Sequence, residues 1–268
     1  GRSAISVDVA ADLLCAVLFA LWAFWWLSNN PLADGYQNEY LHVGNAFDLW
    51  LAMEDRDLWH MRWYMYTGYW PWGLHAVPWP FMALFGMGRL QLVAGNMFHL
   101  AALFAAYRLC SSQIRAPFAM AMLLLAPGVF GALPRFEPSL ANIAWTALGT
   151  AMLVRSRRLN QPYFTAGWGI CLGTGLLMDR LTVLFFLLPA SLPLLWKAGR
   201  YQWRNWGLGL LCAVLVSGAY YREFFLRHTE ELLSQAPVGE IDSAGVLTEA
   251  DNAAPALYYL LALPDAQA

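Results

Sequence analysis

The sequence predicts an all-α integral membrane protein with about seven membrane-crossing helices. Of its 268 residues, 59% are hydrophobic and only 13% are charged, whereas a soluble globular domain carries about 25% charged residues. The apolar residues gather in long runs, most of them close to the roughly 20 residues that a helix needs to cross a bilayer. The aromatic share of 15% suits a protein that meets two membrane–water interfaces, where Trp and Tyr are enriched.

Seven apolar runs are expected to form the crossings. They are 10–28, 90–109, 116–133, 138–154, 164–178, 181–196 and 205–221. The first run has the position of a signal peptide, but no small-residue cleavage motif follows it, so it is expected to be retained as a helix. An eighth stretch, 69–88, is interrupted by prolines, which break helical hydrogen bonding. That stretch is expected to lie on the membrane surface or to be re-entrant, together with an amphipathic helix in the same loop.

The distribution of charge sets the orientation. With seven crossings and the N-terminus in the cytoplasm, the cytoplasmic segments carry nine of the 16 basic residues and, with Asp12 just inside the first crossing counted among them, two of the 18 acidic ones. This is the positive-inside pattern, and it would be lost if 69–88 crossed the membrane. The sequence therefore predicts an integral protein of a membrane such as the bacterial inner membrane, with its active side extracytoplasmic. Residues 1–222 would form the transmembrane module, with an outer loop at 29–89, and residues 223–268 an outer loop or tail.

Some classes of function find no support in the sequence. No basic tract with interleaved aromatics is present, so no nucleic-acid partner is expected. The four cysteines lie in or at the ends of apolar runs without CxxC spacing, as packed core residues do. The histidines of the first outer loop lack the short, fixed spacing of a zinc site, so no metal site is expected.

The segment 34–50 is the first candidate for chemistry. Asp34 lies in a Gly-containing turn just after the first apolar run, and an amphipathic helix is predicted to begin near Asn38. Glu39 and His42 are three residues apart and share a face of that helix. A carboxylate at the lipid–water boundary is partly desolvated, which raises its basicity and suits a general base. The alternative is that both acids only cap and solvate a surface helix.

Two short turns are the other candidates. Glu137 before Pro138 is typical of a helix start, and Arg135 and Glu137 could also face the same outer cavity as the first segment. Asp179 and Arg180 separate two apolar runs. Arg180 could hold a phosphate by paired hydrogen bonds, or the two residues could simply close a tight turn.

Taken together, these segments resemble the polytopic glycosyltransferases of the GT-C class, in particular the protein mannosyltransferase and aminoarabinose transferase type. That family carries an Asp-Glu motif on a juxtamembrane helix after the first crossing, and Asn38-Glu39 is similar. An acid–Pro pair opens the family's fourth helix, as Glu137-Pro138 would here. Further short likenesses are the Pro-rich segment 70–86, the Arg-Leu pair at 89–90, the Gly-Leu stretch at 173–180 and the segment 258–265.

The resemblance implies transfer of a sugar from a polyprenyl-phosphate donor to an acceptor at the outer membrane face. It assigns catalysis to Glu39 or Asp34. The residues that it assigns to the substrate and the lipid phosphate are Arg180, Arg135, Glu137, His42 and Asp179. It implies no protein-bound cofactor and leaves room for a divalent cation. The expected partners are the lipid-linked sugar and membrane lipid.

Two departures from the family keep other functions open. Asn38 replaces one carboxylate of the acidic pair, and family members continue with further helices, so the chain would be a truncated or degenerate member. The alternative is a non-catalytic membrane subunit that uses the same scaffold to bind lipid or a partner subunit. A transporter would need polar residues inside the crossings, where Asn96, His99 and Asn142 are the main ones.

Overall fold

The computed structural model describes residues 37–67, 71–110, 126–179, 182–196 and 198–234, together with Leu18, Leu21 and Trp25. All regular structure in these ranges is helical, which confirms the all-α fold class. The predicted crossing at 10–28 lies outside the described residues, apart from the three single positions, which are helical and exposed. Most of the predicted crossing at 116–133 also lies outside them, and its end forms α9 (Pro127–Ala132). The chain divides into two units, residues 1–220 and 221–268.

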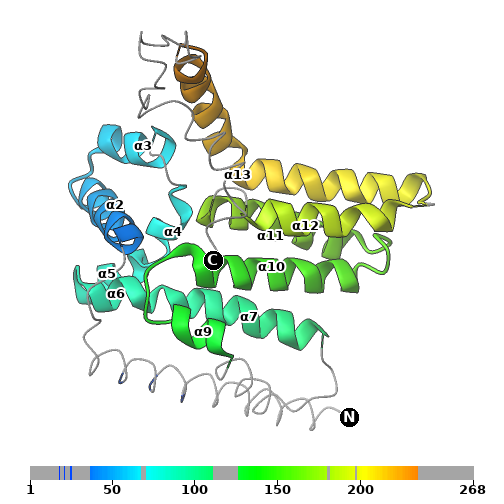
Figure 1. Cartoon of the computed structure of the whole chain (residues 1–268), viewed down its shortest axis with the longest axis horizontal. Helices are drawn as coiled ribbons and strands as arrows, with labels where there is room; N and C mark the ends of the chain where they lie inside the picture. The colour runs from blue at the N-terminus through cyan, green and yellow to red at the C-terminus, as the bar shows by residue number, and fades with distance from the viewer. Residues whose placement is uncertain are drawn as a thin grey trace, which may run out of the picture. The chain divides into compact units, whose positions relative to one another are not determined.

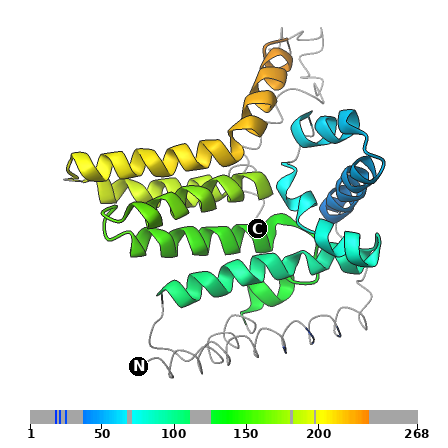
Figure 2. The same cartoon turned by 180° about the vertical axis from the view of Figure 1, so that it is seen from behind.

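Four helices form the centre of the first unit. They are α7 (Asn96–Cys110), α10 (Pro138–Arg155), α11 (Pro162–Met178) and α12 (Thr182–Ser191). α10 packs against each of the other three, and the helices run side by side (Figures 1 and 2). Leu140, Ala141 and Ala144 of α10 are fully buried. Two of these are alanines, whose small side chains let the neighbouring helices approach closely.

The bounds of these helices follow their prolines. α10 and α11 confirm the predicted helices 138–154 and 164–178, and each begins with a proline. Proline suits that position because its φ angle is already helical and its missing N–H has no partner to lose. α12 contains Pro189 and gives way to the 3-10 helix η1 (Leu192–Leu195), whose first turn holds Pro193. The predicted run 181–196 is therefore helical but irregular.

Two described helical segments are long and apolar enough to cross a membrane, judged by length and composition. The first is Arg89–Cys110, in which α6 (Arg89–Ala94) and α7 adjoin at Gly95. The second is Arg200–Leu226 within α13 (Arg200–Ser234). α10 and α11 are shorter, at 18 and 17 residues. The predicted count of seven crossings is thus not reached among the described residues.

The Pro-rich stretch 69–88 is broken into short helices, as its prolines predict. α4 (Gly73–Ala76) and α5 (Trp79–Phe85) are separated at Pro78, and Pro80 lies in the first turn of α5. Gly86 ends α5 with φ of 78°, a left-handed conformation that glycine adopts without steric cost. No continuous crossing helix forms in the described part of this stretch.

The other described helices of the first outer loop are α2 (Gln37–Glu54) and α3 (Leu58–Thr67). α2 confirms the helix predicted near Asn38. Its apolar face packs inside the protein, against α3, α4 and α6. Ala46, Leu49 and Trp50 are buried, whereas Leu51 is 41% exposed. The helix is therefore part of the folded unit.

α11 and α13 cross at glycines. A Cβ atom on Gly209 would lie 2.7 Å from the Trp168 ring and 2.9 Å from the Thr165 carbonyl oxygen. A Cβ on Gly173 would lie 2.7 Å from the Ala213 carbonyl oxygen. Because only glycine lets two helix backbones come this close, the glycines fix where the two helices cross.

The turn between α10 and α11 is strained. Arg157, Arg158 and Leu159 have φ angles of 51°, 58° and 62°, in the left-handed region that costs a non-glycine residue about 1–2 kcal/mol. The Ser156 hydroxyl accepts the Leu159 N–H at 3.1 Å, and the Asn205 side chain of α13 donates to the Leu159 carbonyl at 2.6 Å. The Leu159 side chain is fully buried. Burial and hydrogen bonds together hold the turn in this conformation.

Candidate functional site

The turn before α10 is anchored from the start of α7. Asn96 is 1% exposed, and its side-chain amide donates to the carbonyl oxygens of Leu133 and Arg135, both at 2.8 Å. Phe136 is also buried, at 1% exposed. The turn is thereby held against the helical core, and it delivers the chain to the first residue of α10.

Glu137 occupies the N-cap position of α10, as predicted, but its side chain makes no capping hydrogen bond to the backbone. Its carboxylate instead accepts a hydrogen bond from the Ser139 hydroxyl at 3.0 Å and lies 3.9 Å from an Arg135 Nη1. The two side chains of this ion pair are 17% and 40% exposed. A long, partly exposed pair of this kind contributes little to stability.

Asp179 ends α11 and joins three helices. One oxygen of its carboxylate accepts hydrogen bonds from the Asn142 amide of α10 at 2.5 Å and from the Thr182 hydroxyl at the start of α12 at 2.8 Å. The side chain is only partly buried. Asp179 therefore has a clear structural role at this turn, whatever else it contacts.

A buried histidine pair connects α2 with α4. His42 Nδ1 lies 3.1 Å from His75 Nε2, and the side chains are 2% and 3% exposed. Burial, with a smaller contribution from the neighbouring His42, lowers the pKa of His75 to about 3. The His75 ring also lies 6.5 Å from the ring of Phe136, measured between centroids. The pair therefore links α2, α4 and the turn before α10.

α4 also touches the end of α11. A Cβ on Gly73 would lie 2.6 Å from the carbonyl oxygen of Leu177, two residues before Asp179. The contacts of α4 with α2 and α11, and of Asn142 with Asp179, bring the two predicted turns to one end of the helical unit. Figure 1 shows α2 and α4 at the end where α10 starts.

The predicted site residues fall into four groups. Arg135, Glu137 and Asp179 gather at this end of the unit. His42 belongs to the same region, but its ring faces the interior and contacts His75. Glu39 is in the first turn of α2, three residues before His42; Asp34 and Arg180 lie outside the described residues.

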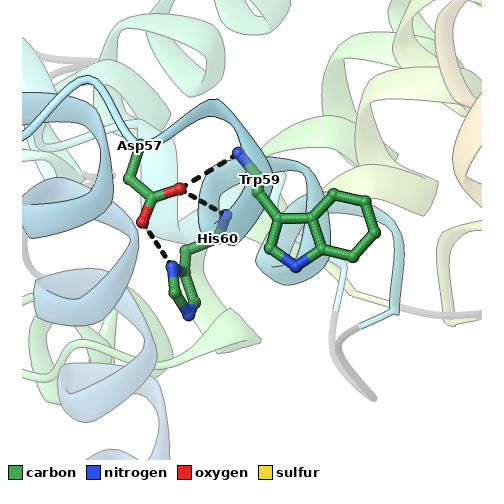
Figure 3. Close-up of polar contacts among 3 residues, drawn as sticks. All are labelled: Asp57, Trp59 and His60. Carbon is green, nitrogen blue, oxygen red and sulfur yellow. Dashed lines mark hydrogen bonds and ion pairs between the residues drawn. The ribbon is translucent and has the colours of Figure 1, made fainter.

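Asp57 and His60 form a second polar cluster at the start of α3 (Figure 3). One Asp57 oxygen accepts the backbone N–H groups of Trp59 and His60, both at 3.1 Å, and the other lies 2.5 Å from His60 Nδ1. The hydrogen bonds of His60 hold the pKa of Asp57 below its usual value. This is an N-cap arrangement, and both side chains are open to solvent.

Sequence reasoning missed the histidine pair. The two residues are 33 positions apart, and each was considered for its spacing to other histidines in the loop. In the sequence, each of the two is a histidine on an otherwise apolar helical face. That pattern indicates a buried side chain, but it does not show which residue the histidine contacts. Among the described residues, no cluster of three or more His, Cys, Asp or Glu side chains could hold a metal ion.

At this end of the unit, two carboxylates, an arginine and a buried histidine pair lie beside helix ends. The carboxylates could accept a proton or orient a hydroxyl, and the arginine could pair with an anion. Comparison with protein families, with curated proteins and with solved structures finds no match to this chain.

Proposed function

We propose that the chain is a membrane glycosyltransferase with a GT-C-like module of about seven crossings. It would transfer a sugar from a polyprenyl-phosphate donor to an acceptor at the extracytoplasmic face of the membrane. The observation that carries the proposal is that the turn with Arg135 and Glu137 and the turn with Asp179 lie at the same end of the helical unit, near α2 and α4. These are the segments in which the resemblance to GT-C enzymes has its acidic and phosphate-binding residues.

The surface of α13 supports a membrane location. Only 22% of the residues in the most apolar window of its candidate span are buried. Leu211, Val214 and Leu215 are exposed at 54%, 61% and 75%. The core helix of a soluble protein is mostly buried, and a soluble surface rarely carries a long apolar face of this kind. Lipid would cover these side chains.

In the proposed reaction, Glu39 or Asp34 takes the proton of the acceptor hydroxyl or amine. The acceptor attacks the anomeric carbon of the donor, with inversion. The bond from that carbon to the phosphate oxygen breaks, and its electron pair leaves with the polyprenyl phosphate. Arg180 and Arg135 stabilise the negative charge on the departing phosphate.

His42 takes a positioning role in this proposal. Its ring is buried against His75, so it does not contact the substrate. It holds α2 against α4, and Glu39 lies three residues earlier in the same helix. The contact would fix where the first turn of α2 sits at the site.

The proposal is tested by a transfer assay in proteoliposomes. Polyprenyl-phosphate mannose and polyprenyl-phosphate aminoarabinose serve as donors, and release of polyprenyl phosphate is measured. We expect release by the wild type and a loss of about 100-fold or more in the double variant Asp34→Asn, Glu39→Gln. Asp48→Asn, which alters an exposed acid of the same helix, is the control and should be unaffected. Full activity in the double variant would rule out the assigned base.

One observation favours a second function, that of a non-catalytic membrane subunit. Leu58, Trp59 and Trp63 of α3 are 75%, 71% and 52% exposed, and they would suit contact with a partner subunit or with lipid. Asn38 in place of an acid agrees with lost catalysis. Stable co-purification with one partner, lost in Trp59→Ser and accompanied by no turnover, would favour this function over transfer.

A further inference from the structure

A cavity of about 580 Å³ opens at the opposite end of the helical unit from the candidate site. It lies where α10 passes to α11 and η1 passes to α13. Polar lining comes from Arg158, Asn160 and Gln202, and apolar lining from Pro193, Leu194 and Trp196. Arg158 carries the only charge among the described lining residues. The lining therefore offers nitrogen donors beside an apolar wall, and no described carboxylate.

The turn that presents Arg158 is held in a costly conformation. Arg158 is the middle one of the three successive left-handed residues at 157–159. Side chains of α13 hold the turn from the other side, since Gln202 donates to the Asn160 side-chain oxygen at 2.8 Å and Asn205 to the Leu159 carbonyl. Asn160 donates in turn to the Arg157 carbonyl at 2.8 Å. Strain that its surroundings enforce in this way is typical of functional sites.

The same end of the unit has the composition of a membrane–water interface. Tyr163, Trp196, Tyr201 and Trp203 are 87%, 81%, 50% and 50% exposed, as in an aromatic belt at the headgroup level. Among the described residues, the arginines at this end are Arg108, Arg155, Arg157, Arg158, Arg200 and Arg204. By the positive-inside pattern this end faces the cytoplasm, where the leaflet carries anionic lipid.

We propose that this cavity binds the phosphate of an anionic phospholipid headgroup. The Arg158 guanidinium pairs with the phosphate oxygens. The Asn160 and Gln202 amides each use one N–H in the turn and have a second to donate. The apolar wall receives the glycerol and the first methylenes of the acyl chains. This inference depends on the membrane location and does not depend on sugar transfer.

The test uses the purified full chain in detergent, with phosphatidylglycerol and phosphatidylcholine as probes and native mass spectrometry as the readout. Glycine adopts the left-handed conformation without cost, so Arg158→Gly removes the side chain without disturbing the turn. Arg157→Gly is the matched control, because Arg157 has the same conformation but is not among the cavity-lining residues. Thermal unfolding confirms that both variants fold.

We expect phosphatidylglycerol to bind in preference to phosphatidylcholine. Arg158→Gly should weaken phosphatidylglycerol binding by about tenfold and Arg157→Gly by less than about twofold. Equal weakening in the two variants, or no preference for the anionic lipid, would overturn the proposal. Displacement of the lipid by equimolar inorganic phosphate would also overturn it, because the site would then take a soluble phosphate.

Discussion

Single residues at the candidate site act mainly through what they hold in place. His42 and His75 are both buried and lie within hydrogen-bond distance, so this contact fixes α2 against α4. Asn96 similarly anchors the turn that contains Arg135 through two carbonyl groups. His99, one turn later in α7, is fully buried, and neither ring nitrogen has a hydrogen-bond partner among the described residues. Burial alone therefore does not show which polar residues hold two elements together; their hydrogen-bond partners do.

The burial of His75 makes stability depend on pH. The folded-state pKa of His75 is about 3, below the ordinary value of 6.5. As the pH falls, the unfolded chain therefore binds a proton at this histidine before the folded chain does. The free energy of unfolding has its full value above pH 6.5 and decreases as the pH falls toward 3. We expect the free energy of unfolding to fall by up to about 1.4 kcal/mol per pH unit below pH 6.5.

The measurement is denaturation of the detergent-solubilised protein at pH 7.5, 6.5 and 5.5, with His75→Gln beside the wild type. Glutamine keeps a hydrogen-bonding side chain but does not titrate. As the pH falls from 6.5 to 5.5, the free energy of unfolding of the wild type should decrease more than that of His75→Gln. Parallel behaviour of both proteins over this range would mean that His75 is not the titrating group.

At the scale of the element, the sequence predicted the helices better than their ends. Prolines and apolar runs placed α10 and α11 within two residues of their observed bounds. α13 was predicted only over 205–221, although it extends from Arg200 to Ser234. Its charged ends are helical without being apolar, so the apolar run in the sequence is shorter than the helix. The irregular end of α12 follows from Pro189 and Pro193. Both prolines are visible in the sequence, but whether they bend the helix or end it depends on packing.

The glycine contacts between α11 and α13 give a test at the same scale. Gly209→Ala would push a methyl group against Trp168 and the Thr165 carbonyl. Such overpacking costs about 1–3 kcal/mol, so we expect a lower unfolding temperature. Gly207→Ala is the control on the same helix, because a Cβ there meets no atom within 4 Å. It should be neutral or slightly stabilising, since alanine favours helix over glycine.

Equal unfolding temperatures for Gly209→Ala and Gly207→Ala would contradict this crossing, because they would mean that the two helices do not approach at Gly209. The sequence does not identify which helix contacts α11 at these glycines. Gly169 and Gly173 have the spacing of a close-packed membrane helix, but the spacing alone does not say which helix lies against them.

At the scale of the whole molecule, the first unit has chemically different ends. Acidic and imidazole groups gather where α10 begins, and arginines with exposed aromatics gather where α10 ends. From charge alone, the sequence predicted that most basic residues lie on the cytoplasmic side of the membrane, and that orientation stays a prediction. The sequence also placed Glu137 at a common outer cavity with the first outer segment, but it could not predict the histidine pair or the Asn142–Asp179 contact, because these join residues 33 and 37 positions apart.

The orientation of the two ends can be measured by cysteine labelling in spheroplasts, in a Cys110→Ser background. Ser139→Cys reports on the acidic end and Tyr163→Cys on the basic end; both positions are exposed. We expect a membrane-impermeant maleimide to label position 139 in intact spheroplasts and position 163 only after permeabilisation. Labelling of both positions from one side, or the reverse pattern, would contradict the proposed topology.

The central claim is that the acidic end of the unit receives a polyprenyl phosphate, and direct binding tests it. The purified chain in nanodiscs is titrated with polyprenyl phosphate, in wild type and in Arg180→Ala, Glu39→Gln and Arg62→Ala. The proposal predicts saturable binding that Arg180→Ala weakens about tenfold. It predicts little change in Glu39→Gln, whose role is in the reaction, or in the control Arg62→Ala, which alters an exposed arginine of α3. Absent binding, or the same affinity in all four proteins, would contradict the account and favour the non-catalytic subunit.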